Sequence, residues 1–316
     1  MTGATDLTAV KAIAARQRIT DEDVAHLRRV VFGDGVAQAH ELAALFELNG
    51  ACPEFTTAWR DFFVEGVVDF LVHKRPPEGY IVDEDARVVI DLIGADGRVK
   101  TATELEALIK ALEAARAAPE TLNDFALLQV KLTVLNQSPP LRLDPPKIEL
   151  IRRVLYAGGG ESGIAVSRRE AEVLFDINDR VAGSGDNDAW CDLFAKAVGN
   201  HIMAAAGRAV PSRQEALRRE QWLAAPSAGV GGFLARMFKS KPTESAESWA
   251  RRNAETEESI RKSEVVTLGE ATWLKDRINR DGALTRAETR LLHFIKDVSP
   301  DIAPALSELI AKARAA

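Results

Sequence analysis

The apolar positions of the chain recur mainly at helical spacing, and strand-like alternation is nearly absent. Residues three and four positions apart lie on one face of a helix, so such runs predict amphipathic helices. Two runs show the spacing most clearly, with Leu105, Leu108 and Ile109 in the first and Leu291, Leu292 and Ile295 in the second. The pattern predicts an all-α protein.

Each of these runs begins with a helix-start signal. Thr101 lies three residues before Glu104, and Thr285 lies three residues before Glu288. In this arrangement, a capping box, the threonine hydroxyl and the glutamate carboxylate satisfy backbone N–H groups that the first turn leaves open. The same spacing occurs at two further sites, Ser167 with Glu170 and Thr267 with Glu270.

The two halves of the chain share three further matches in the same order. They are RRVVFGDG at 28–35 with RRVLYAGG at 152–159, ELAALFELN at 41–49 with EAEVLFDIN at 170–178, and AWRDFF at 58–63 with AWCDLF at 189–194. Each half then ends in an Asp-Gly turn followed by the capped run. These ordered matches predict two tandem copies of one helical bundle module, an internal duplication.

A proline-rich stretch separates the copies. Proline forbids helix continuation and favours an extended spacer, and four prolines occur within 138–147. We therefore expect a first helical domain at 1–137, a linker at 138–147 and a second domain at 148–316. The second copy also holds an insertion at about 224–264, rich in Ser, Gly, Glu and Arg, which predicts a flexible segment.

Composition narrows the classes of partner. The 316 residues carry a net charge of −6, so phosphate backbones would repel the chain as a whole and nucleic acid is not expected as a partner. The two cysteines, Cys52 and Cys191, form no CxxC pair, which argues against a disulfide framework or zinc site. With no signal peptide and no long apolar run, the sequence predicts a cytoplasmic protein without a membrane span.

A divalent cation is the alternative to a protein without cofactors. The turn around Asp281 fits an EF-hand template in part, with weak candidate ligands at Asn279, Asp281, Thr285 and Glu288. The first ligand position of that template is Arg277, whose charge would repel Ca²⁺. We therefore expect no metal, and calcium or another divalent cation remains the alternative.

Motifs of familiar enzymes are missing from the sequence. It contains no GxSxG, no GxxxxGK[ST] and no paired histidines at zinc-ligand spacing. An enzyme with an unrecognised acidic site would need four carboxylates to converge, namely Asp176, Asp179, Asp186 and Asp188. Helix capping is the simpler role for these residues, so the chain is expected not to be an enzyme.

Two sets of large apolar residues are candidates for binding a ligand or a partner. Trp59 and Trp190 each precede a phenylalanine at i + 4, which favours core packing over a ligand platform. Within the insertion, the basic segment 229–241 places four large apolar residues on one helical face. These residues are Phe233, Leu234, Met237 and Phe238. We expect them to contact a partner protein or a membrane surface, or to fold back on their own domain.

The repeated order of helix, Asp-Gly turn and capped helix resembles the TerB-like family, the all-helical domains of tellurite-resistance proteins and of a DnaJ-type co-chaperone. The residues that carry the resemblance are 95–104 and 281–288. It implies a helical bundle of stress-linked or membrane-proximal assemblies, with acidic residues able to take a divalent ion. Together these features predict a non-enzymatic cytoplasmic interaction or adaptor protein; the alternatives are an EF-hand-like calcium sensor and an enzyme with an acidic site.

Overall fold

The computed structural model describes residues 7–94, 97–136, 141–157, 166–182, 187–203, 268–278, 280, 284–298 and 304–315. Within these residues the fold is helical, which confirms the all-α prediction. Strand pairing there amounts to β1 (Arg18–Ile19) alongside β2 (Glu54–Phe55), in parallel, and one isolated bridge. No helix of the described part is long and apolar enough to cross a membrane.

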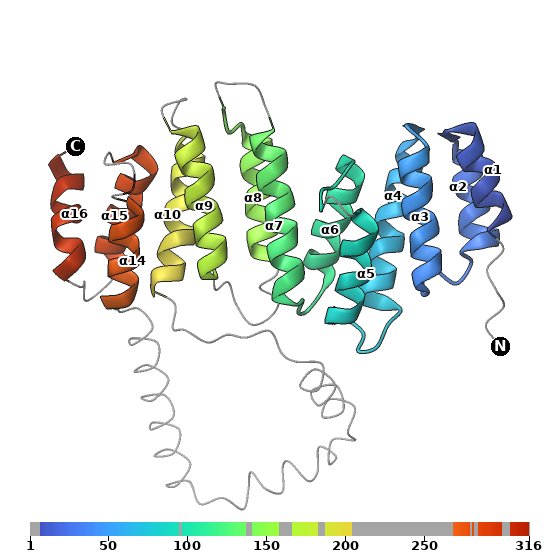
Figure 1. The fold of residues 1–316 in the computed structure, drawn as a ribbon, viewed down its shortest axis with the longest axis horizontal. Helices are drawn as coiled ribbons and strands as arrows, with labels where there is room; N and C mark the ends of the chain where they lie inside the picture. Colours follow the sequence, from blue (N-terminus) through green and yellow to red (C-terminus); the bar gives the residue numbers. More distant parts are fainter. Residues whose placement is uncertain are drawn as a thin grey trace, which may run out of the picture. The chain divides into compact units, whose positions relative to one another are not determined.

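The chain divides into two compact units, residues 1–164 and 165–316. The helices of the first unit are α1 (Thr8–Arg16), α2 (Asp21–His26), η1 (Leu27–Val31), α3 (Ala39–Ala51), α4 (Thr57–Val68), η2 (Asp69–His73), α5 (Asp83–Ile93), α6 (Ala102–Ala114), α7 (Glu120–Leu135) and α8 (Pro145–Ala157). Those described in the second are α9 (Arg168–Val181), α10 (Asp188–Met203), α14 (Leu268–Ile278), α15 (Arg286–Val298) and α16 (Pro304–Ala315). Figure 1 shows their order along the chain.

Side-chain caps start several of these helices where the sequence predicts them. Ser167 and Glu170 form the reciprocal box at the start of α9, and Thr285 and Glu288 do so before α15. At α6 the Thr101 hydroxyl accepts the Glu104 N–H at 3.2 Å, whereas the Glu104 carboxylate reaches the N–H of Lys100. A cap of this kind contributes about 0.5–2 kcal/mol to helix stability.

Each unit is built around one dominant helix pair. In the first unit α4 packs on α6, and in the second α10 packs on α15. The aromatic centre of the first pair is Trp59 with Phe63, whose ring centroids are 6.1 Å apart, and that of the second is Trp190 with Phe194 at 5.8 Å. All four rings are buried, which confirms their predicted core role.

Helix α8 changes the domain division that the sequence predicts. The linker expected at 138–147 includes Pro145 and Pro146, but these prolines form the first turn of α8. Proline fits there because the first turn has no intrahelical use for its missing N–H. Asp144 caps the helix by accepting the N–H of Lys147 at 3.1 Å. Because α8 packs on α6 and α7, it belongs to the first unit, not to a second domain starting at 148.

Candidate functional site

A buried asparagine joins three helices of the first unit. The Nδ2 of Asn49 in α3 donates to Oγ1 of Thr101 at 2.9 Å and to Oε1 of Glu104 at 3.1 Å. Its Oδ1 accepts the indole N–H of Trp59 from α4 at 3.3 Å. One amide therefore satisfies the cap of α6 and the indole of α4 away from water, where an unpaired donor would cost about 1–3 kcal/mol.

The second unit contains the same junction. Asn178 in α9 donates to Oγ1 of Thr285 at 3.1 Å and accepts the indole N–H of Trp190 from α10 at 3.2 Å. The Glu288 carboxylate accepts the N–H of Thr285 at 2.8 Å. Neither asparagine is predicted as a functional group by the sequence, although each is the last residue of a matched string.

This junction decides what Thr285 and Glu288 do. Both were weak candidate metal ligands, and both are engaged in capping α15. The other two candidates, Asn279 and Asp281, lie outside the described residues. Among the residues that the structure describes, no group of three or more His, Cys, Asp or Glu is placed to hold a metal ion.

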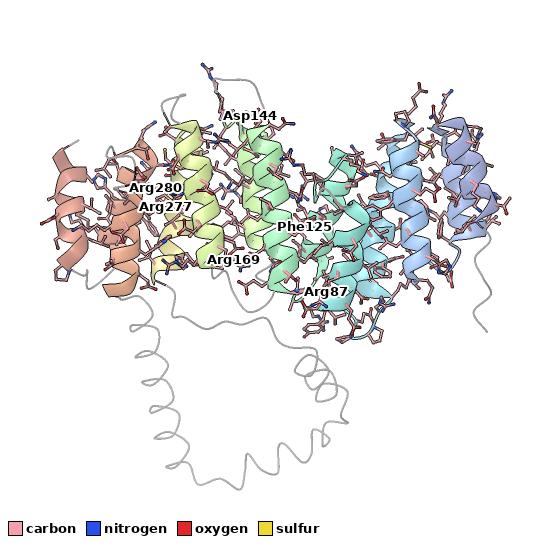
Figure 2. All side chains as sticks on the ribbon, viewed as in Figure 1. Arg87, Phe125, Asp144, Arg169, Arg277 and Arg280 are labelled. Carbon is pink, nitrogen blue, oxygen red and sulfur yellow. The ribbon has the colours of Figure 1, made fainter. Side chains whose placement is uncertain are left out.

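Arg277, the residue at the first ligand position of the EF-hand template, is buried and contacts acidic residues of α9. It is labelled in Figure 2. Its side chain is 5% exposed and lies 2.6 Å from Asp176, 3.3 Å from Asp179 and 3.2 Å from Glu172. Its guanidinium also lies over the Phe175 ring, 5.2 Å from the centroid. The guanidinium therefore lies among three carboxylates of α9 and offsets part of their negative charge.

The carboxylates of the alternative acidic site are consequently divided. Asp176 and Asp179 surround Arg277, while Asp188 at the start of α10 pairs with Arg286. Asp186 lies outside the described residues. The three described carboxylates thus pair with two separate arginines.

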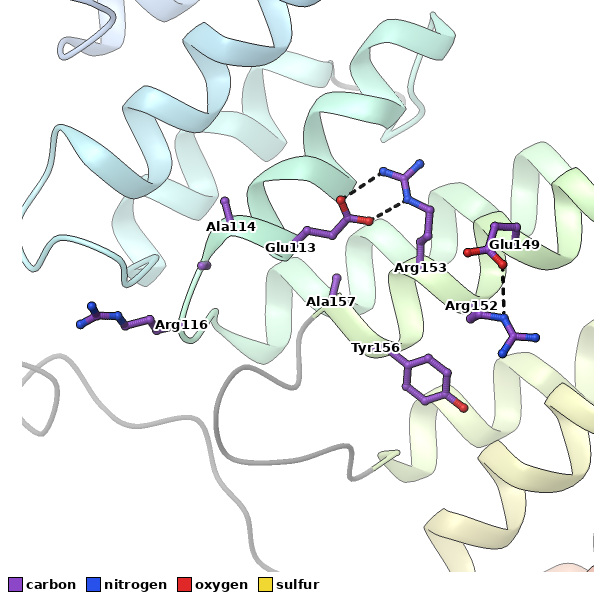
Figure 3. Close-up of a pocket in the computed structure, with 9 residues that line it drawn as sticks. Glu113, Ala114, Arg116, Glu149, Arg152, Arg153, Tyr156 and Ala157 are labelled. Carbon is purple, nitrogen blue, oxygen red and sulfur yellow. Dashed lines mark hydrogen bonds and ion pairs between the residues drawn. The ribbon is translucent and has the colours of Figure 1, made fainter.

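A pocket of about 550 Å³ lies between the end of α6 and α8 in the first unit (Figure 3). Burial raises the pKa of its Tyr156 hydroxyl, although the Arg152 charge opposes the shift. Arg152 itself lies 3.3 Å from Glu149 in an exposed pair. The lining residues are Glu113, Ala114, Ala115, Arg116, Glu149, Arg152, Arg153, Tyr156 and Ala157.

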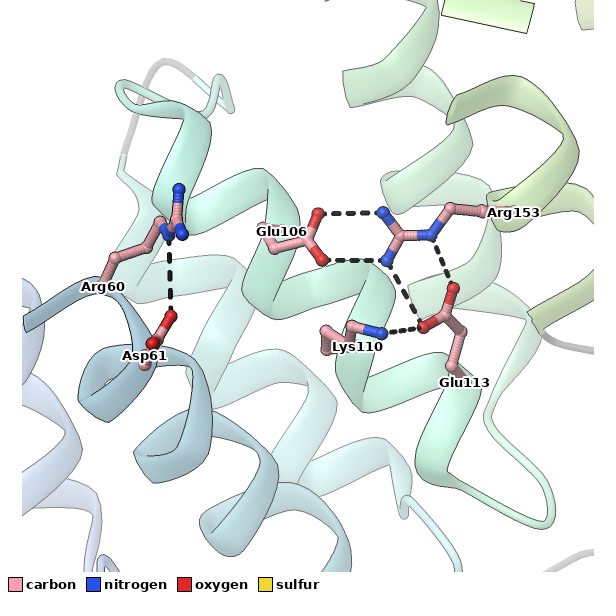
Figure 4. A network of polar contacts seen from close by, with 6 residues as sticks. All are labelled: Arg60, Asp61, Glu106, Lys110, Glu113 and Arg153. Carbon is pink, nitrogen blue, oxygen red and sulfur yellow. Dashed lines mark hydrogen bonds and ion pairs between the residues drawn. The ribbon is translucent and has the colours of Figure 1, made fainter. Parts of the chain in front are cut away.

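Arg153 fixes α8 on α6 beside this pocket (Figure 4). Its two terminal nitrogens donate to the two carboxylate oxygens of Glu106, each at 2.9 Å, and its Nε donates to Glu113 at 2.7 Å. These bonds, to Glu106 first, raise the pKa of Arg153. Burial alone would raise the pKa of Glu113, but hydrogen bonds from Arg153 and Lys110 hold it below its usual value.

The predicted partner-binding residues lie outside the described part. Phe233, Leu234, Met237 and Phe238 fall within 204–267, together with the insertion predicted at about 224–264 and the segment 229–241. Their role stays a prediction. The structure adds the α6–α8 joint, which sequence reasoning missed because Glu106, Glu113 and Arg153 are far apart along the chain.

No protein-family model, no curated protein and no solved structure matches the chain.

Proposed function

We propose that this chain is a non-enzymatic interaction module of TerB-like helical type, which works in the cytoplasm by binding a protein partner. The observation that carries the proposal is the use of its buried and half-buried polar side chains. Asn49 and Asn178 close helix junctions, and Arg153 and Arg277 join helices through ion pairs. These groups hold helices in place, as a binding scaffold requires.

The matched junctions also support an internal duplication. Asn49 and Asn178 each accept an indole N–H and donate to a capping threonine, at distances that agree within 0.2 Å. Two unrelated helix sets would have little reason to share this buried arrangement. We propose that the helices around the two junctions derive from one ancestral module.

The cytoplasmic assignment rests on the cysteines. Cys52 and Cys191 are both buried, and neither forms a disulfide. Proteins of oxidising compartments commonly use cysteines as disulfides, whereas thiols persist in the reducing cytoplasm. Two buried cysteines outside any disulfide are what a cytoplasmic scaffold would carry.

The proposal is tested by finding and then rebuilding a binary complex. The tagged full-length chain and a variant lacking 224–264 are expressed in the native cell, and proteins retained by each are quantified by mass spectrometry. We expect at least one protein to be enriched and to bind again when both components are purified. Failure of every enriched protein to bind the purified chain would contradict the proposed function.

A further inference from the structure

One face of α8 provides the first half of the inference. Leu150, Arg153, Val154 and Ala157 share this face at i, i + 3, i + 4 and i + 7. Arg153 bonds to Glu106 and Glu113 on α6, and Val154 is only 2% exposed. The face is therefore covered by a helix pair, α6 and α7, on which α8 packs.

The matching face at the start of the chain is exposed. The match of 28–35 with 152–159 makes Arg29, Val30 and Gly33 equivalent to Arg153, Val154 and Ala157 of the α8 face. The same offset, continued two residues upstream, places His26 at the position of Leu150. All four are exposed, and Val30 reaches 61%. The opposite face of the same segment is buried through Val24, Leu27 and Val31, so the segment is docked on its own unit by one side only. We call the exposed set the α2 face.

The two neighbouring arginines of this segment differ in their contacts. Arg28 is engaged, because it donates to both carboxylate oxygens of Glu65 at 2.8 and 2.6 Å and lies over the Phe62 ring. Arg29 has no such ion pair among the described residues. Both belong to η1, a π-helical turn closed by the N–H of Phe32 on the carbonyl of Leu27 at 2.8 Å. Such turns occur frequently at functional sites.

We infer that the α2 face is a docking surface for a partner protein that presents an acidic helix, with two carboxylates seven residues apart as in α6. The inference rests on the proposed function and names the partner's chemistry. Arg29 would take the place of Arg153 between the two carboxylates, and Val30 would take the place of Val154 against the apolar side of the partner helix. An exposed guanidinium and a carboxylate pair are complementary in charge and in bidentate geometry.

A second copy of this chain fits the face less well. Its own α6 already holds α8 through Glu106 and Glu113. Its α15 carries Arg290 and Asp297 at the positions that match those two glutamates, and Arg290 is paired with Asp192. Arg29 would therefore meet a cation there. These charges favour a different protein as the occupant.

The test uses the α6–α7 hairpin as a surrogate partner. A helix-stabilised, fluorescently labelled peptide of residues 98–136 is checked for helicity by circular dichroism and titrated with the full-length chain by anisotropy. We expect saturable binding that Arg29→Glu and Val30→Asp each weaken at least tenfold. Arg87→Glu, which alters an exposed arginine on α5, is the matched control and should leave the affinity within twofold.

Charge reversal identifies the contact. A hairpin carrying Glu106→Arg and Glu113→Arg should bind the Arg29→Glu chain better than it binds the wild type. Absence of binding, equal binding of a scrambled peptide, or sensitivity to Arg153→Glu in place of Arg29→Glu would each overturn the inference. A concentration-dependent dimer in sedimentation, lost with Arg29→Glu, would also overturn it by making a second copy the occupant.

The result can be separated from that of the proposed function. If the Arg29→Glu, Val30→Asp chain still binds the protein identified by capture, the α2 face is the wrong surface and the interaction module stands. If no protein binds the wild-type chain, the proposed function fails whatever the peptide does.

Discussion

Helices α5 and α14 each precede the capped helix of their own unit, and the two are attached to their neighbours differently. Both bury an alanine, an aliphatic residue and an isoleucine on one face: Ala86, Val89 and Ile93 in α5, and Ala271, Leu274 and Ile278 in α14. Helix α5 lies directly on α3 and α7. Helix α14 also reaches α9 through long polar side chains, with Trp273 donating to Glu172 and Arg277 to Asp176, both at 2.6 Å.

The comparison shows that two helices with similar buried apolar faces can be attached to their neighbours by different kinds of contact. Apolar burial stabilises by about 25 cal/mol per Å² and is insensitive to moderate salt. Ion pairs to partly exposed carboxylates are screened by salt and weakened by acid. We therefore expect the attachment of α14 to respond to ionic strength and pH. Helix α5 also makes an ion pair, from Asp85 to Arg75 at 2.6 Å, but the Asp85 side chain is only 4% exposed, so salt should screen that pair less.

The largest effect should come from the junction that both units share. Asn49→Ala leaves the Trp59 N–H without its acceptor and removes both donated bonds, so we expect a loss of about 2–4 kcal/mol. Asn178→Ala should cost less, because Asn49 also serves the Glu104 carboxylate. Hydrogen exchange read by mass spectrometry assigns the loss to each unit, with the exposed Asn136→Ala as control. A greater loss of stability for Asn178→Ala than for Asn49→Ala would contradict this ranking of the two junctions.

The charged joint inside the first unit comes next in size. Arg153→Ala removes the cation that Glu106 and Glu113 share and leaves Glu113 with Lys110, so we expect α8 to lose about 1–3 kcal/mol of protection. Its neighbour Arg152 makes one exposed pair with Glu149, so Arg152→Ala should cost less than about 1 kcal/mol. Equal exchange rates for α8 in the two variants would show that Arg153 does not hold the helix.

Arg277 tests the attachment of α14. Arg277→Met keeps an apolar stem over Phe175 but removes the cation that Glu172, Asp176 and Asp179 share. Because those carboxylates are partly exposed, the expected loss is about 1–2 kcal/mol and should shrink in 0.5 M salt to about half. The control is Lys275→Met, which removes a solvent-exposed charge of the same helix. A loss independent of salt would point to packing as the cause.

These tests address features that the sequence predicts unevenly. The caps at Ser167 and Thr285 follow from local spacing, and the structure has them. The role of Asn49 does not follow, since a polar residue at the end of an apolar run resembles a surface position. Gln129 is similar: it is fully buried on α7, donates to the carbonyl of Gly97 at 2.7 Å and accepts the N–H of Val99. The contacts of Gln129 join residues about thirty positions apart, so they leave no local pattern in the sequence.

His201 should make the stability of the second unit sensitive to acid. Burial lowers the pKa of this side chain, which outweighs the opposing hydrogen bond to the Val166 carbonyl and the charges of Glu270 and Glu172. A lowered pKa means that the unfolded chain takes the proton first, so stability is lost as the pH falls below about 6.5. Urea midpoints at pH 7.5 and 5.5, read by exchange in α10, should differ more in the wild type than in His201→Gln. An equal difference would assign the acid response to other groups.

The smallest expected effect is on calcium. Cytosolic sensors bind Ca²⁺ at about 10⁻⁷–10⁻⁵ M through an acidic first ligand, and Arg277 stands at that position with its charge directed into the acidic face of α9. Calorimetry should therefore show no site tighter than about 10⁻⁴ M in the wild type. Arg277→Asp removes the internal cation and adds a fourth carboxylate to Glu172, Asp176 and Asp179, so it should bind Ca²⁺ more tightly and gain thermal stability in its presence. Micromolar binding at one equivalent by the wild type would favour the sensor hypothesis and would show that the buried arginine does not exclude the ion.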